Sequence, residues 1–126
     1  MAFKLSKRSL DKLSGVHPDL VAVVKRAIET TEIDFVVTEG LRTKERQAEL
    51  FKAGASTTMN SRHITGHAVD LAAWVGEVRW DWALYHKLAD AMKKAAAEVN
   101  VPIVWGGDWV TFKDGPHFEL DRKVYP

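Results

Sequence analysis

The sequence contains no cysteine, and its 126 residues carry nearly balanced charge, with 18 lysines and arginines against 17 acidic residues. The absence of cysteine excludes disulfides and thiolate metal ligands, so any transition metal must be held by histidine and carboxylate groups. The small net charge gives no overall field that would favour a nucleic acid or an acidic membrane surface as partner. The composition therefore directs the search for function to local groups of side chains.

Long apolar runs are also missing. Charged residues interrupt every apolar segment well before the roughly 20 residues that span a bilayer, and residues 1–8 lack the apolar stretch of a secretory signal. We therefore expect that the protein does not insert into a membrane and that it accumulates in the cytoplasm of the producing cell. A chain of 126 residues can build one independent core, so we expect a single domain, residues 1–126.

Apolar periodicity and capping residues predict about three helices, at 18–30, 43–54 and 82–99. Short β-branched and aromatic segments predict strands at 33–39, 67–74, 101–105, 109–112 and 117–120. A hairpin is expected just after residue 74, and the polar stretch 55–61 indicates an exposed loop. The pattern favours a small α+β domain in which helices pack on a mostly antiparallel sheet.

Three residues have the side chains of a metal site. His63 and Asp70 lie seven residues apart in one segment, and His117 lies in another near the end of the sequence. A catalytic zinc site needs three protein ligands, with imidazole nitrogen or carboxylate oxygen as donors, and leaves a fourth position to water. Along the predicted strand Asp70 shares a face with Ala68 and Ala72, whose small side chains leave room for an ion. The sequence therefore predicts a zinc site on the sheet face.

Two carboxylates accompany the predicted ligands. Asp114 precedes His117 by three residues across a Gly-Pro turn, so it can sit near the metal, take a proton from zinc-bound water and pass it to the leaving amine. Glu119 shares the strand face of His117 and is expected to hydrogen-bond a ligand imidazole, which would fix its tautomer. We interpret Asp114 as the general base.

The two motifs, Ser-x-His-x-x-Gly-x-Ala-x-Asp at 61–70 and Asp-x-x-His at 114–117, resemble those of the D-Ala-D-Ala carboxypeptidase/L-alanyl-D-glutamate peptidase family of zinc peptidases. An N-terminal helix, the segment Thr-Glu-Gly-Leu-Arg-Thr at 38–43 and the final His-Phe-Glu-Leu extend the resemblance over roughly the whole chain. It implies that His63, Asp70 and His117 bind zinc and that Asp114 is the catalytic base. It also places Arg42 beside the metal, where a guanidinium would orient the substrate or stabilise the oxyanion.

With an aspartate at the base position, a short length and no visible signal peptide, the sequence resembles the phage endolysins of this family, which cut between L-Ala and D-Glu of the peptidoglycan stem peptide. The resemblance implies a monomeric phage or prophage lysis enzyme that binds the stem peptide without a separate cell-wall-binding domain. An enzyme that accumulates in the cytoplasm acts on the wall only after the membrane is permeabilised. A separate pore-forming protein is therefore an expected partner.

Two other functions stay open at this point. A D-Ala-D-Ala carboxypeptidase or dipeptidase would use the same site, and the loop at 55–60 that would distinguish it has no readable pattern. A non-catalytic wall-binding module would keep the fold, although the presence of Asp114 argues against it. The remaining histidines, His17, His67 and His86, are expected outside the metal site, and the tryptophans at 74, 80, 82, 105 and 109 as core and cleft walls.

Overall fold

The computed structural model describes residues 2–56, 58–59, 61–111 and 113–126. In chain order its elements are α1 (Lys7–Lys12), α2 (Pro18–Thr30), β1 (Phe35–Glu39), α3 (Lys44–Lys52), β2 (Ala68–Trp74), β3 (Val78–Arg79), α4 (Trp82–Val99), β4 (Ile103–Trp105), the 3₁₀ turn η1 (Gly106–Asp108) and β5 (His117–Leu120). The described part of the chain thus forms four α-helices and five strands. This confirms the predicted α+β class, with one helix more than expected.

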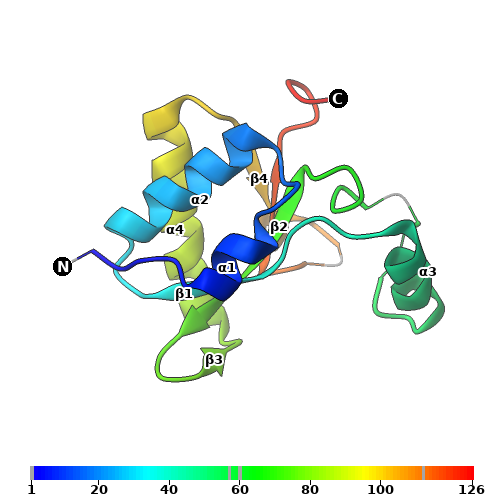
Figure 1. Ribbon diagram of the computed structural model, residues 1–126, viewed down its shortest axis with the longest axis horizontal. Coiled ribbons are helices and arrows are strands. Elements are labelled where there is room, and N and C mark those ends of the chain that lie inside the picture. The colour runs from blue at the N-terminus through cyan, green and yellow to red at the C-terminus, as the bar shows by residue number, and fades with distance from the viewer. Residues whose placement is uncertain (1, 57, 60, 112) are drawn as a thin grey trace.

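The sheet is antiparallel, with strand order β1-β2-β5-β4 and with β3 paired to the end of β2. Figure 1 shows β2 running through the middle of the molecule. β2 and β5 are distant in sequence but adjacent in the sheet, where Asp70 lies opposite His117 and Val69 opposite Phe118. This register brings two of the predicted metal ligands side by side.

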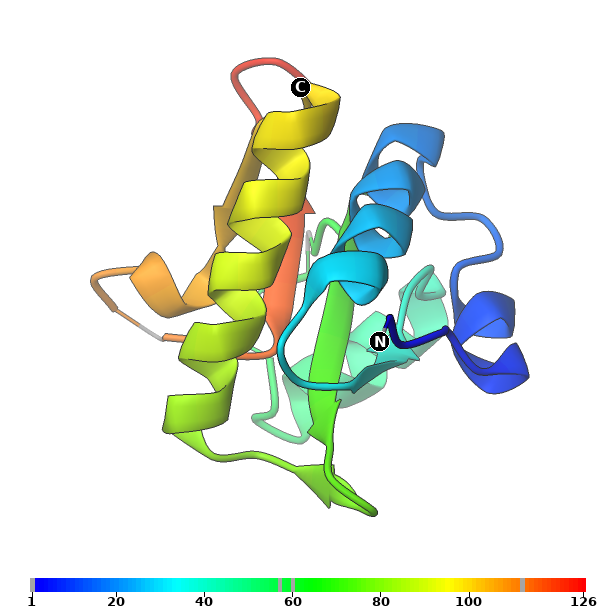
Figure 2. The same ribbon diagram turned by 90° about the vertical axis from the view of Figure 1, so that its left-hand side faces the viewer.

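The two long helices, α2 and α4, cover one face of the sheet (Figure 2). Val69, Leu71 and Phe118 point to this side, and each is 0% exposed. Burying a side chain of this size stabilises the fold by about 1.5–3 kcal/mol. Because successive residues face opposite sides of a strand, Asp70 and His117 point to the other face. The apolar core therefore determines which face carries the polar site.

The apolar pattern predicts no helix at 7–12, where the structure has α1. The Ser6 hydroxyl accepts a hydrogen bond from the Ser9 backbone N–H at 3.1 Å and so caps the helix. The Ser9 hydroxyl accepts in turn from the backbone N–H of Val37 in β1, at 3.0 Å. A helix of six residues is too short to be stable alone in water. Contact with the edge of β1 therefore stabilises α1, and α1 in turn covers that edge.

The longest helix, α4, has the predicted bounds. It ends at Asn100, whose φ of 59° is left-handed and whose N–H bonds to the Ala96 carbonyl. Asp81 occupies the predicted N-cap position, but its carboxylate accepts from Arg79 at 2.6 Å instead of capping the helix. Among the described residues, no helix combines the length and apolar character that crossing a membrane requires.

The predicted strand at 109–112 is wrong for the residues that the structure describes. Residues 109–111 belong to no strand, and Phe112 lies outside the described residues. The chain leaves β4 through η1, the Trp109 ring packs 5.1 Å from the His117 ring, and Val110 is 94% exposed. Trp109 therefore contacts the candidate site instead of a neighbouring strand. β1 and β4 begin two residues later than predicted, at Phe35 and Ile103.

Candidate metal centre

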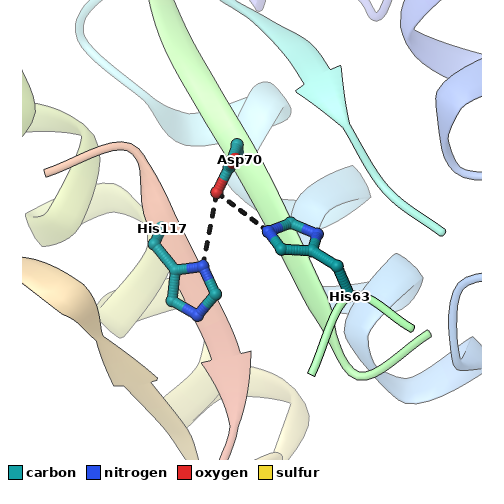
Figure 3. Close-up of side chains that lie close together, drawn as sticks. All are labelled: His63, Asp70 and His117. Carbon is teal, nitrogen blue, oxygen red and sulfur yellow. Dashed lines mark hydrogen bonds and ion pairs between the residues drawn. The ribbon is translucent and has the colours of Figure 1, made fainter. Parts of the chain in front are cut away.

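The structure brings His63, Asp70 and His117 together as one candidate metal group on the sheet face opposite the long helices (Figure 3). Asp70 Oδ1 lies 3.2 Å from His63 Nε2 and 3.3 Å from His117 Nδ1. One donor atom from each residue lies within 4.8 Å of the others. The histidines are only 2% and 6% exposed. These are the three residues that the sequence motifs predict as metal ligands.

Each histidine is oriented through the nitrogen that faces away from the cluster. His63 Nδ1 lies 2.8 Å from the Gly40 carbonyl oxygen, which can only accept, so this nitrogen donates. His117 Nε2 lies 2.8 Å from Glu119 Oε1. These partners leave His63 Nε2 and His117 Nδ1 to face Asp70. The predicted contact of Glu119 with a candidate ligand is thus present, and the pairing suits metal-binding histidines.

The spacing of the donor atoms fits a tetrahedral ion. Zinc bonds to imidazole nitrogen and carboxylate oxygen are about 2.0–2.2 Å long, which separates two tetrahedral ligand atoms by about 3.3–3.6 Å. The two distances from Asp70 Oδ1 to the imidazole nitrogens, 3.2 and 3.3 Å, are close to this value. Both distances from Asp70 therefore fit a tetrahedral metal site.

The backbone at Gly66 requires the glycine of the first motif. Its φ of +76° is left-handed, and a Cβ at this position would lie 2.5 Å from the Gly15 carbonyl oxygen. Its own carbonyl accepts from the His17 N–H at 2.8 Å. A larger residue would therefore strain the turn between His63 and β2.

Asp114 lies in the same site. A cavity of about 520 Å³ is lined by Asp114 together with all three candidate ligands. Burial and the negative charge of Asp70 raise the pKa of the Asp114 carboxyl, although the two histidines oppose this shift. A carboxylate with a raised pKa is better matched to proton transfer near neutral pH. The structure thus places the predicted general base beside the metal group.

Arg42 also lines the cavity, where its Nη2 lies 3.9 Å from Asp70 Oδ2. Its Nε and Nη2 donate to the two carboxylate oxygens of Glu39 at 2.5 and 2.7 Å. Its Nη1 donates to Gln47 Oε1 at 2.7 Å. The guanidinium is therefore held in place by protein groups, and it faces the metal group chiefly as a fixed positive charge.

Gln47 is a site residue that the sequence patterns do not indicate. Its side chain is 0% exposed, although most of α3 faces solvent. Besides accepting from Arg42, it donates to the Ser56 hydroxyl at 2.8 Å and to the Thr58 carbonyl at 2.5 Å. Gln47 thus joins Arg42 to the segment that lines the cavity at Ser56 and Thr58.

Replacing Gln47 by leucine is expected to destabilise the protein by about 1–3 kcal/mol, because buried polar partners lose their hydrogen bonds. Loss of the bond to Arg42 should also lower kcat. Thermal unfolding and turnover measurements check both effects. The exposed Lys52→Gln variant in the same helix should change neither, and an unchanged melting temperature for Gln47→Leu would contradict the expectation.

The other histidines lie outside the metal group, as expected. His67 Nδ1 contacts the Thr65 hydroxyl at 2.7 Å, and its ring lies 5.6 Å from that of His17. His86 packs against Trp105 at 5.2 Å. Among the tryptophans, Trp105 is buried in the core and Trp109 lines the cavity. The other three, Trp74, Trp80 and Trp82, are 42%, 52% and 45% exposed, so a core position is wrong for them.

The chain is similar to known proteins over its whole length. Residues 1–125 match the profile of a family described as phage L-alanyl-D-glutamate peptidase. The L-alanyl-D-glutamate peptidase of Escherichia phage T5 is 33% identical over 130 residues, which cover 99% of this chain and 94% of the relative.

Solved structures agree with the sequence comparison. The L-Ala D-Glu endopeptidase ChiX of Serratia marcescens superimposes with a TM-score of 0.92 and 46% identity, covering 98% of this chain and 94% of that one. The vancomycin-resistance D,D-dipeptidase VanXYg gives a TM-score of 0.57 at 20% identity, covering 83% of this chain and 50% of that one. At that identity the likeness to VanXYg concerns the fold alone.

Proposed function

Because the chain belongs to the phage L-alanyl-D-glutamate peptidase family, we propose that it hydrolyses the bond between L-alanine and D-glutamate in peptidoglycan stem peptides. The phage T5 relative and the Serratia endopeptidase are both named for this bond. The observation that carries the proposal is the group of His63, Asp70 and His117 in one cavity with Asp114. A metallopeptidase needs such a metal site together with a base.

Zinc is the metal we propose, with His63, Asp70 and His117 as its ligands. Two imidazole nitrogens and one carboxylate oxygen are a common donor set for catalytic zinc, and the two distances from Asp70 Oδ1 to the imidazole nitrogens fit tetrahedral geometry. When bound, zinc supplies a Lewis acid that lowers the pKa of water to about 7 and polarises the scissile carbonyl. Glu119 keeps His117 in the tautomer that such a site requires.

Asp114 serves as the general base in this proposal. Its carboxylate accepts a proton from the attacking water and then delivers that proton to the nitrogen of the leaving amine. Its position in the cavity and its raised pKa support both steps. Arg42, held by Glu39 and Gln47, stabilises the negative charge that develops on the carbonyl oxygen.

The family also supports a proposal for the biological setting. We propose that residues 1–126 form one catalytic domain that acts as a monomer in phage or prophage lysis. The enzyme accumulates in the cytoplasm and reaches the wall through a membrane pore made by a separate protein. The phage T5 peptidase, of which the chain covers 94%, supports the phage part of this proposal.

Product analysis tests the proposed bond. Purified peptidoglycan is incubated with zinc-loaded enzyme and, in parallel, with chelated enzyme, and the soluble products are analysed by mass spectrometry. Zinc-dependent release of stem peptides that begin at D-Glu is the expected result. Release of free D-Ala would identify a carboxypeptidase instead, and no product from several wall types would indicate a binding module.

Zinc binding is expected to strengthen as pH rises from 7 to 9. Burial favours neutral His117, but hydrogen bonds with Asp70 and Glu119 outweigh it and raise the pKa of His117 to about 9 in the metal-free protein. Below that pH the metal must displace a proton, so affinity should fall about tenfold per pH unit. Competition with a chromophoric chelator, corrected for the chelator's own protonation, measures this. An affinity independent of pH between 7 and 9 would contradict it.

A further inference from the structure

The cavity around the metal group is lined by two described side chains with a permanent positive charge, Arg42 and Lys113. Arg42 is already engaged, because Glu39 and Gln47 accept its hydrogen bonds at 2.5–2.7 Å. Lys113 is exposed and makes no hydrogen bond or ion pair with any residue that the structure describes. Its ammonium group is therefore the free cation of this cavity wall within the described chain.

The proposed substrate has a negative charge close to the bond that is cut. D-Glutamate has two carboxyl groups, so a peptide that continues through the side-chain carboxyl leaves the α-carboxylate free. Standard bond lengths place that carboxyl carbon about 2.5 Å from the amide nitrogen, which becomes the leaving amine. Any group that donates a proton to this nitrogen therefore lies near the α-carboxylate as well.

The position of Asp114 indicates where this carboxylate lies in the cavity. In the proposed mechanism Asp114 delivers the proton to the leaving nitrogen, and Lys113 is its neighbour in the chain. Their Cα atoms are therefore about 3.8 Å apart. A lysine side chain extends about 6 Å from its Cα, so Lys113 can reach the leaving-group side of the scissile bond.

The acidic residues of the cavity make a cation beside the substrate carboxylate favourable. Three acidic residues line it, Glu39, Asp70 and Asp114. Glu39 is paired with Arg42, and Asp70 contacts both histidines. Asp114 makes no ion pair with another described residue, and its charge, although offset in part by both histidines and Arg42, would repel a substrate carboxylate. A neighbouring ammonium group would offset this repulsion.

We infer that Lys113 binds the α-carboxylate of the D-glutamyl residue and so favours substrates in which this group is charged over substrates in which it is an amide. The inference rests on the proposed function. It makes Lys113 a specificity-determining residue on the leaving-group side of the cavity.

Two synthetic peptides test the inference. Both contain acylated L-Ala followed by D-Glu, both continue through the side-chain carboxyl of D-Glu, and they differ only in having an α-carboxylate or an α-carboxamide. Wild-type enzyme should prefer the carboxylate peptide by about tenfold in kcat/KM, the size expected for a hydrogen bond between charged groups. Lys113→Gln should lose this preference, by a tenfold decrease on the carboxylate peptide and a change within about twofold on the carboxamide.

Three further variants sharpen the test. Lys113→Arg should keep the preference, and Lys113→Glu should reverse it, because the new charge repels the carboxylate. Lys94→Gln makes the same charge change at an exposed position of α4, behind the sheet, and should leave both rates within about twofold. Circular dichroism melting checks that every variant is folded.

The possible failures are distinguishable. If wild-type enzyme cleaves neither peptide, the proposed function is wrong and the inference falls with it. If wild-type enzyme cleaves the peptides and Lys113→Gln lowers both rates equally, or leaves the preference unchanged, the proposed function stands and the inference is overturned.

Discussion

Replacing Asp114 by asparagine is expected to lower kcat by about 10²–10⁴-fold while one zinc ion per chain stays bound. Asparagine has nearly the same shape as aspartate but cannot take a proton from water. The three candidate metal ligands are unchanged, so the metal content should be unchanged. Turnover of a stem peptide and metal analysis after dialysis measure the two quantities separately.

The connection between β4 and β5 offers a matched control. Asp108 precedes Asp114 in the connection between β4 and β5, and its carboxylate accepts from Lys93 at 2.7 Å on the surface. Asp108→Asn should stay within about twofold of wild type, because exposed ion pairs contribute little. If Asp114→Asn retained full activity, another group would have to be the base. If it lost the zinc, Asp114 would be a ligand instead.

Replacing His63 by alanine is expected to remove both the metal and the activity. This change deletes one of three proposed ligands and leaves Asp70 and His117, which cannot hold zinc with the affinity of a complete site. After dialysis the variant should contain far less than one zinc ion per chain, and turnover should fall below detection. Elemental analysis and the stem-peptide assay provide the measurements.

His67 provides the control for this experiment. It lies four residues further along the same segment, but its ring contacts Thr65 and His17 instead of the metal group. His67→Ala should keep both zinc and activity. Equimolar zinc in His63→Ala, or loss of zinc in His67→Ala, would show that the assignment of ligands is wrong.

The sequence predicts the central strands and the longest helix well because each has a local signal. α4 has a continuous apolar stripe and an asparagine that ends it. In β2 and β5, apolar residues for the core alternate with Asp70 and His117 for the opposite face. Strand periodicity alone thus places these two side chains on one face. The register that sets them opposite each other is visible only in the sheet.

The features that the sequence does not predict depend on contacts between distant segments. α1 has no apolar stripe and is stabilised where Ser9 bonds the edge of β1. Gln47 has the pattern of a surface residue, and it is buried because Ser56, Thr58 and Arg42 surround its side chain. Trp109 begins the apolar segment that the pattern predicts as a strand, but its ring packs against His117. None of these partners lies in the same helix or strand as the residue that it contacts.

The pairing of β2 with β5 also has a consequence for synthesis of the protein. Asp70 and His63 leave the ribosome long before His117, which lies on the last strand of the sheet. A nascent chain that ends before β5 lacks one proposed metal ligand and a central strand of the core, so it can neither hold the ion with three side chains nor complete its fold. Under the proposed ligand assignment, hydrolytic activity therefore arises only once β5 has been made.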